Sequence, residues 1–265
     1  MHYQNICLEA KEVVKNAAAY IQSWHENRDK MDIQAKGRHN FVTEVDKKAE
    51  EILVEGLLKL LPESGFIAEE GTSNHRGKVY NWIIDPIDGT TNFIHGLFPF
   101  SISVGLTEGE EIVAGIVYVF GMDEYFYAWK GGGAWLNGKA IQVSKVKAVE
   151  QSLIATGFPY TNFTYLEEFK ISLDFFMKNS HGLRRLGSAA TDIAYVACGR
   201  YDGFYEYGLN PWDIAAGMIL VQEAGGKISD FRGGSDPLYK DTFLASNSLI
   251  YNEFHEAVQQ IMLAG

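Results

Sequence analysis

The stretch that decides the fold runs from residue 79 to residue 93 and reads Val-Tyr-Asn-Trp-Ile-Ile-Asp-Pro-Ile-Asp-Gly-Thr-Thr-Asn-Phe. Its first six residues predict a hydrophobic strand that leads directly into Asp85. Pro86 fixes its own φ and keeps Asp85 out of the helical region, so the chain has to turn while Asp85 and Asp88 converge. Gly89 lets the backbone approach a ligand closely, and the residues after it are typical of a following helical turn.

This turn has the features of a metal-dependent phosphate site. Free N–H groups at such a turn favour an anion. Two aspartates are compatible with a neighbouring anion only if cations lie between them, because like charges repel. An ordinary turn rich in Asp, Pro, Gly and Thr remains the alternative for the stretch taken alone.

Two further acidic segments lie far from this stretch in the sequence. Residues 66–68 predict a short strand that ends in Glu69-Glu70-Gly71. Asp213 follows Asn210-Pro211-Trp212 and precedes a mostly apolar run, 214–221, which predicts a buried helix. Simple N-capping explains an aspartate at the start of a helix, but a buried carboxylate needs a partner cation. We therefore expect these acids to meet Asp85 and Asp88 in space.

Hydrophobic periodicity gives the order of the remaining elements. Helices are expected at about 3–27 and 45–61, on either side of a polar, mobile loop at 28–42. Strands are expected at 66–68, 79–85, 100–107, 112–119 and 124–129, and Asn137-Gly138 indicates a hairpin turn. From residue 150 the expected order is strand 152–156, helix 165–178, strand 182–186, helix 189–199, strand 202–207, helix 212–224, strands 227–231 and 242–246, and helix 249–263.

Two segments carry a resemblance to a known family. One runs from Trp82 to His95 around the turn described above, and the other reads Trp212-Asp-Ile-Ala-Ala-Gly217 and continues to Glu223-Ala-Gly-Gly226. Shorter matches are Phe41-Val-Thr-Glu-Val-Asp46, Gly187-Ser-Ala-Ala190 and Tyr201-Asp-Gly-Phe-Tyr-Glu206. In this order and separation they resemble the inositol monophosphatase family of magnesium-dependent, lithium-sensitive phosphatases, in its bacterial form. The resemblance covers essentially the whole chain.

The resemblance implies a layered α-β-α-β-α sandwich with an α+β N-terminal half and an α/β C-terminal half. A seam near residue 147 would divide it into residues 1–147, which carry most of the metal ligands, and residues 148–265, which carry Asp213 and the substrate side. Binding sites often lie at such junctions, so we expect the active site between the halves.

The resemblance also implies the metal site and the catalytic groups. The implied metal ligands are Glu69, Asp85, Asp88 and Asp213, with the main-chain carbonyl of Ile87. All are oxygen donors, as Mg²⁺ prefers, and the family implies two or three ions. Asp46 and Thr90 match the pair that orients and deprotonates the metal-activated water, which attacks in line with the leaving oxygen. Glu70 is expected to contribute to the surroundings of the same water.

Substrate contacts are implied on both sides of the phosphate. The main-chain N–H groups of Gly89 and Thr90 match the phosphate cradle. The loop beside the substrate ring matches Gly187, Ser188 and Ala189, and Glu206 matches a contact with a ring hydroxyl. Arg184 and Arg185 could bind a phosphate bidentately, although an interface salt bridge is as good an explanation for Arg184.

Composition limits the possible partners. The net charge of −11, from 34 acidic and 23 basic residues, leaves no basic face for nucleic acid and no polybasic membrane patch. An empty site would repel a phosphorylated substrate, so metal binding should come first. Two cysteines in this length suit a reducing cytoplasm, and no stretch is long and apolar enough to span a bilayer.

The implied activity is hydrolysis of a phosphate monoester, with inositol 1-phosphate as the first expectation, by a homodimer. Fructose-1,6-bisphosphatase and nucleotide 3′-phosphatase activities remain alternatives. A non-catalytic role as a transcription accessory factor is another, because the pair Arg184-Arg185 resembles that of relatives with such a role. The intact set of acidic ligands favours an enzyme.

Overall fold

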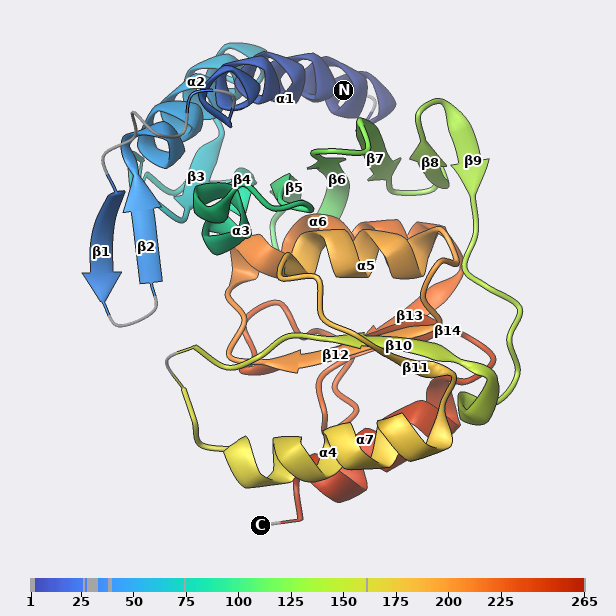
Figure 1. The fold of residues 1–265 in the computed structure, drawn as a ribbon. Coiled ribbons are helices and arrows are strands. Elements are labelled where there is room, and N and C mark those ends of the chain that lie inside the picture. Colours follow the sequence, from blue (N-terminus) through green and yellow to red (C-terminus); the bar gives the residue numbers. More distant parts are fainter. Residues whose placement is uncertain are drawn as a thin grey trace.

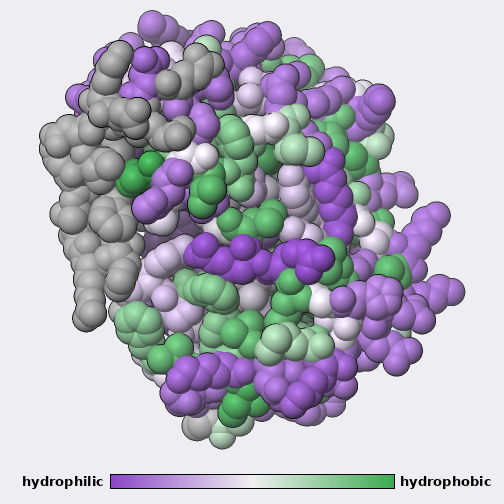
Figure 2. Space-filling view, in the orientation of Figure 1, coloured by the Kyte–Doolittle hydropathy of each residue, from purple (hydrophilic) through white to green (hydrophobic). Residues whose placement is uncertain are grey.

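Helices and sheets alternate in five layers in the computed structural model, which describes residues 3–25, 27, 33–37, 40–73, 75–160 and 162–264 (Figure 1). From one face to the other, the layers are α1 (Tyr3–His25) with α2 (Glu44–Leu60), a seven-stranded sheet, α5 (Ala189–Ala197) with α6 (Pro211–Glu223), a five-stranded sheet, and α4 (Leu166–Asn179) with α7 (Tyr251–Met262). This is the layered α-β-α-β-α sandwich that the sequence predicted. On the face shown in Figure 2, hydrophilic side chains cover most of the outer helices at both ends of the stack, and hydrophobic and hydrophilic residues are mixed over the middle layers.

The second strand of the seven-stranded sheet contains Asp85 and Asp88 of the stretch 79–93. Its strands, in spatial order, are β3 (Gly65–Ala68), β4 (Tyr80–Asp88), β5 (Ser101–Glu108), β6 (Glu111–Val119), β7 (Glu124–Trp129), β8 (Ala134–Leu136) and β9 (Lys139–Ile141). Only β3 and β4 pair in parallel; each later strand is antiparallel to its neighbour. The predicted Asn137-Gly138 hairpin joins β8 to β9, and both residues have positive φ, 49° and 83°, as such a turn requires.

The five-stranded sheet has the order β11 (Gly182–Arg184), β10 (Leu153–Thr156), β12 (Gly203–Tyr207), β14 (Thr242–Asn247) and β13 (Gly226–Ser229). Strand β10 is parallel to both of its neighbours, and β14 is antiparallel to both of its own. The 3₁₀ turn Val149–Gln151 precedes β10 in the connection between the two sheets. The predicted seam at residue 147 falls in this connection, and the division of the chain there stays a prediction.

The segment 28–42 differs from the mobile loop that was predicted. Strands β1 (Ile33–Gly37) and β2 (Asn40–Thr43) form an antiparallel hairpin. The prediction is therefore wrong for 33–37 and 40–42, while 28–32, 38 and 39 lie outside the described residues. The polar composition concealed β-branched and aromatic residues at positions 33 and 41–43, which favour extended structure.

Helix α6 lies between the two sheets and is buried along most of its length, from Ile214 to Val221. It packs closely on the first sheet because Gly105 and Gly115 carry no side chain. A Cβ atom on Gly105 would come within 2.8 Å of the Ala215 side chain, and one on Gly115 within 2.7 Å of the Ala216 carbonyl. The predicted buried helix is confirmed, and its packing brings Asp213, in its first turn, beside the ends of β4 and β5.

Within the described part of the chain, none of the helices combines the length and apolarity that crossing a membrane requires.

Candidate active site

The end of β4 is bent by an irregularity in its pairing with β5. Asp85 pairs with Ser103 and Asp88 with Ser101, so one more residue lies between the pairs on β4 than on β5. The Asp85 carboxylate accepts a hydrogen bond from the Ile87 N–H at 2.9 Å, and Gly89 turns the chain with a φ of 95° into the short helix α3 (Thr90–His95). The turn and the helical start that the sequence predicted are both present.

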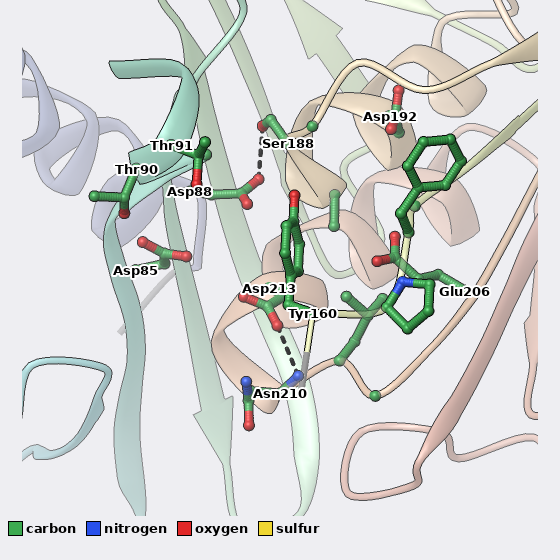
Figure 3. Close-up of a pocket in the computed structure, with 18 of the residues that line it drawn as sticks. Asp85, Asp88, Thr90, Thr91, Tyr160, Ser188, Asp192, Glu206, Asn210 and Asp213 are labelled. Carbon is green, nitrogen blue, oxygen red and sulfur yellow. Dashed lines mark hydrogen bonds between the residues drawn. The ribbon is translucent and has the colours of Figure 1, made fainter. Parts of the chain in front are cut away.

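Carboxylates from three separate segments meet at this bend, and Figure 3 shows three of them, Asp85, Asp88 and Asp213. Carboxylate oxygens of Asp85, Asp88 and Asp213 all lie within 4.8 Å of one another. Glu69, at the end of β3, lines the same cavity, and its charge contributes to raising the pKa of Asp85. The convergence that the sequence predicted is therefore present in the fold.

Burial raises the pKa values of three of these carboxyl groups, and repulsion between the acids adds to the shift in Asp85 and Asp213. The pKa of Asp85 lies well above its usual range because of burial, followed by the charges of Glu69, Asp88 and Asp213. Burial also raises the pKa of Asp88, although hydrogen bonds oppose the shift. Burial and the charge of Asp88 raise the pKa of Asp213 to about 7. Such a cluster of hard oxygen donors could hold divalent cations, whose charge would offset the repulsion.

Hydrogen bonds fix the orientation of two of these carboxylates. Asp88 Oδ2 accepts from Ser188 Oγ at 2.6 Å and from the Ala190 N–H at 2.8 Å, both at the start of α5. Asp213 Oδ2 accepts from the Asn210 N–H at 2.7 Å, which closes the first turn of α6 (Figure 3). Asn210 is the N-cap of α6, and Asp213, as the third helical residue, completes the capping box as well as contributing to the acidic cluster.

The predicted catalytic pair is in contact. Thr90 Oγ1 lies 3.3 Å from Asp46 Oδ1, to which it donates, and 3.0 Å from the carbonyl oxygen of Ile87. Asp46 is buried in the first turn of α2. Thr90 lines the cavity, whereas Glu70 is not among the described residues that line it.

The loop that carries Glu69 is anchored by a residue that the sequence did not reveal. Glu50, fully buried on α2, accepts hydrogen bonds from the Glu70 N–H at 2.7 Å, the Thr72 N–H at 2.8 Å and Thr72 Oγ1 at 2.7 Å. Its position four residues after Asp46 places both acids on one helix face, next to buried Ala49 and Leu53. A charged residue on an otherwise apolar helix face was the signal that could have identified it.

Two glycine turns from the two halves of the chain lie against each other beside Asp88. A Cβ atom on Gly89 would come within 2.9 Å of the Gly187 carbonyl oxygen. Asn92 holds the turns together, because its Nδ2 donates to the carbonyls of Pro99 at 2.7 Å and Leu186 at 2.8 Å. The loop 187–189 thus forms one wall of the site, while the Ser188 side chain bonds to Asp88.

The cavity continues away from the acidic cluster and has a volume of about 210 Å³. Glu206 is buried in this part of the cavity, and Gly157 makes room for it, since a Cβ there would lie 2.0 Å from Glu206 Oε1. Burial raises the pKa of Glu206 well above its usual range, the charges of Asp213 and Asp88 add to the shift, and Arg185 opposes it.

The two adjacent arginines have different positions. The Arg185 guanidinium lines the cavity, donates to the Tyr160 hydroxyl and lies 5.2 Å from the centre of the Phe158 ring. Arg184 is exposed, donates to the carbonyl of Leu183 and does not line the cavity. Only Arg185 is therefore placed to meet a ligand bound there.

Sequence reasoning also missed Asp192. It lies on α5, one turn after Ser188, is 1% exposed and lines the cavity. Burial, followed by the charges of Glu206 and Asp88, raises its pKa well above the usual range. The sequence signal that could have identified Asp192 was the presence of an acidic residue within the predicted apolar helix 189–199.

The five-layer fold, with a carboxylate cluster at the end of β4 and the start of α6, defines a phosphatase of the layered-sandwich type. The chain matches the model of the inositol monophosphatase family over residues 2–263 and belongs to that family. The resemblance noted in the sequence is confirmed.

Individual relatives are similar to this chain over most of their length. An inositol-1-monophosphatase of Mesorhizobium japonicum is 41% identical over 236 residues, which are 88% of each chain. A protein of Pseudomonas aeruginosa named Nus factor SuhB is 38% identical over 261 residues, 96% of this chain and 95% of the relative. The solved structure of the extragenic suppressor protein suhB from Bartonella henselae superposes with a TM-score of 0.91 at 36% identity, covering 97% of this chain and 98% of that one. The protein is therefore a phosphatase whose family acts on small phosphate monoesters.

Proposed function

We propose that the protein hydrolyses a polyol phosphate monoester, with inositol 1-phosphate as the leading substrate, and that it depends on Mg²⁺. The observation that carries this proposal is the meeting of buried carboxylates within 4.8 Å of one another beside the Gly89 turn. The proposed metal ligands are Glu69, Asp85, Asp88 and Asp213, with the Ile87 carbonyl. When bound, Mg²⁺ supplies charge neutralisation for the phosphoryl group and lowers the pKa of water.

We propose that each of the remaining site residues acts on the phosphate, on the attacking water or on the leaving group. The N–H groups of Gly89 and Thr90 are proposed to bind phosphate oxygens, because the positive φ of Gly89 turns the chain at this point. Thr90, hydrogen-bonded to Asp46, is proposed to orient the attacking water and pass its proton to the Asp46 carboxylate. For Glu70 we propose a supporting role in the same region.

On the leaving-group side, we propose that Glu206 accepts a hydrogen bond from a substrate hydroxyl and that the loop 187–189 borders the substrate ring. The Ser188 side chain contributes by holding Asp88. Of the two arginines, Arg185 is proposed to face the substrate. Positioning and charge neutralisation of this kind dominate phosphoryl transfer, because its transition state involves little covalent work by the protein.

A panel of phosphate esters at saturating Mg²⁺ tests the proposal. We expect inositol 1-phosphate to have a higher kcat/KM than fructose 1,6-bisphosphate and a nucleoside 3′-phosphate. Asp88→Asn should reduce turnover by more than about 100-fold, because even groups that only orient metal ligands change activity by 10–100-fold. Near-wild-type turnover by Asp88→Asn, or far faster turnover of the bisphosphate than of every monophosphate, would refute the proposal.

We also propose a second, non-catalytic role as a transcription accessory factor, which similarity to the Pseudomonas Nus factor over 96% of this chain favours. Arg184 is exposed outside the cavity and could serve such a role without affecting catalysis. In a strain that lacks this gene, Asp88→Asn should then restore transcription while Arg184→Ala should not. Failure of both variants, or success of both, would contradict this role for Arg184.

The other family properties remain part of the proposal: a homodimer, two or three Mg²⁺ ions, inhibition by Li⁺ and a cytoplasmic location. Both cysteines, Cys7 and Cys198, are free thiols, which suits a reducing compartment. Sedimentation of the purified protein tests the dimer, and Mg²⁺ titration of its activity with and without Li⁺ tests the ions.

A further inference from the structure

Two buried polar atoms with opposite hydrogen-bonding needs line the leaving-group half of the cavity. Asp192 Oδ1 is an acceptor and Arg185 Nε–H is a donor. Within the part of the chain that the structure describes, neither atom has a hydrogen-bond partner, although both residues line the cavity. An unsatisfied buried polar group destabilises a protein, so a ligand that satisfies both atoms would bind with that advantage.

The two side chains come from a buried helix and from the strand-to-helix connection that precedes it. Asp192 is 1% exposed on α5, the helix whose N-terminus holds Asp88. The Arg185 guanidinium donates to the Tyr160 hydroxyl and lies 5.2 Å and 5.4 Å from the ring centres of Phe158 and Tyr160. A ligand in this part of the cavity would therefore meet an acid held on a buried helix and a cation beside two aromatic rings.

These groups lie on the side of the cavity away from the acidic cluster. In the view of Figure 3, Asp192 and Glu206 lie on one side of the Tyr160 ring, and Asp85 and Asp88 lie on the other. The charge of Arg185 lowers the pKa of both Asp192 and Glu206, against the larger effect of burial, which places the guanidinium near both carboxylates. Two buried acids and one guanidinium therefore share the lining of this cavity.

The chemistry of the two unpartnered atoms identifies the ligand group. A hydroxyl can donate to Asp192 and accept from Arg185 at the same time. A phosphate dianion has no proton to donate to Asp192 Oδ1, and beside two buried acids it would find a single guanidinium to pair with. An ammonium group has no lone pair with which to accept from Arg185.

We propose that Asp192 and Arg185 form a hydroxyl-recognition subsite that selects polyhydroxylated monophosphates and disfavours a second phosphate group. This subsite rests on the proposed function and adds to it a residue pair and a reason for rejecting bisphosphates. Asp192 acts on specificity by contacting the leaving group, beside Glu206. It takes no part in the contact between Thr90 and Asp46.

The test compares Asp192→Ala and Asp192→Asn with the wild type on inositol 1-phosphate, p-nitrophenyl phosphate and fructose 1,6-bisphosphate. For inositol 1-phosphate we expect kcat/KM to fall about 10- to 100-fold in Asp192→Ala, mainly through KM, as loss of a hydrogen bond to a charged group implies. The loss on p-nitrophenyl phosphate, whose leaving group has no hydroxyl to donate, should be at least about ten times smaller. At a pH at which Asp192 is ionised, Asp192→Asn should raise kcat/KM for the bisphosphate relative to that for inositol 1-phosphate, because it removes one repelling charge.

Asp202→Asn is the matched control. Asp202 is a buried carboxylate that accepts from the Leu153 N–H at 2.7 Å and from Ser144 Oγ at 2.5 Å, outside the cavity. This control should change the stability of the protein without changing the ratio of the kcat/KM values for the different substrates. Equal losses on all substrates in both Asp192 variants, or no loss on any, would overturn the subsite alone. A wild-type enzyme that hydrolyses no polyol monophosphate would overturn the proposed function and the subsite with it.

Discussion

Replacing Asp213 by asparagine should stabilise the metal-free protein while abolishing its activity. Burial and the charge of Asp88 raise the Asp213 pKa from 3.8 to about 7 in the folded state. The folded protein then binds this proton more tightly than the unfolded chain, so its stability falls as the pH rises through this range. At about 1.4 kcal/mol per pKa unit, the ionised group destabilises the metal-free protein by about 4 kcal/mol at pH 8 and by about 2 kcal/mol at pH 5.

Thermal unfolding in a chelator measures this effect. Asparagine keeps an oxygen that can accept from the Asn210 N–H, which in the wild type lies 2.7 Å from Asp213 Oδ2. Since a protein of this size shifts its Tm by roughly 2–4 °C per kcal/mol, Asp213→Asn should melt roughly 10 °C higher than the wild type at pH 8 and roughly 5 °C higher at pH 5.

Adding Mg²⁺ should reverse the order of the two melting temperatures, so that the wild type melts above Asp213→Asn. Metal binding stabilises the folded wild type by mass action, while the variant lacks one proposed ligand and should gain less stability. Its turnover should fall more than about 100-fold. The control Asp202→Asn removes a buried carboxylate outside the cluster and should lower stability at both pH values. A variant that melts below the wild type in chelator at pH 8, or one that keeps its activity, would refute this reasoning.

Three further substitutions test the groups that support the site. Ser188→Ala removes the 2.6 Å hydrogen bond to Asp88 and should raise the Mg²⁺ concentration for half-maximal activity about 10-fold or more, measured by metal titration. Glu50→Gln replaces one of the two oxygens that hold the 70–72 loop and should have a similar effect, together with a loss of about 1–3 kcal/mol in the free energy of unfolding. Gly157→Ala places a Cβ 2.0 Å from Glu206 Oε1 and should raise KM for inositol 1-phosphate about 10-fold, with less effect on p-nitrophenyl phosphate. Unchanged metal titrations for the first two variants, or an unchanged KM for the third, would contradict these roles.

Local sequence rules predicted the features that depend on short-range backbone chemistry. Pro86 lies in the bend between Asp85 and Asp88, Gly89 turns the chain directly after Asp88, and Asn137-Gly138 forms a tight hairpin, because each is determined by the φ preferences of a few adjacent residues. The layered fold followed from the family resemblance. Strand β4 continues to Asp88, three residues beyond the predicted end, because pairing with β5 resumes at Ser101 after the irregularity.

Contacts between distant segments were not predictable in the same way. Glu50 holds a loop that lies 20 to 22 residues away in the sequence, and the Arg185 guanidinium lies against Phe158 and Tyr160 of another loop. The burial of Asp192 follows from the packing of α5 between the two sheets. The spacing of residues along the sequence reports local secondary structure and does not reveal these contacts. Each contact exists only when the tertiary fold brings separate segments together.

Anomalous diffraction from crystals grown with Mn²⁺ in place of Mg²⁺ and with phosphate tests the central claim most directly. The account predicts anomalous peaks bounded by carboxylate oxygens of Glu69, Asp85, Asp88 and Asp213, with phosphate between the ions and the Gly89 turn. Peaks at other positions only, or a phosphate bound without metal at these carboxylates, would contradict it.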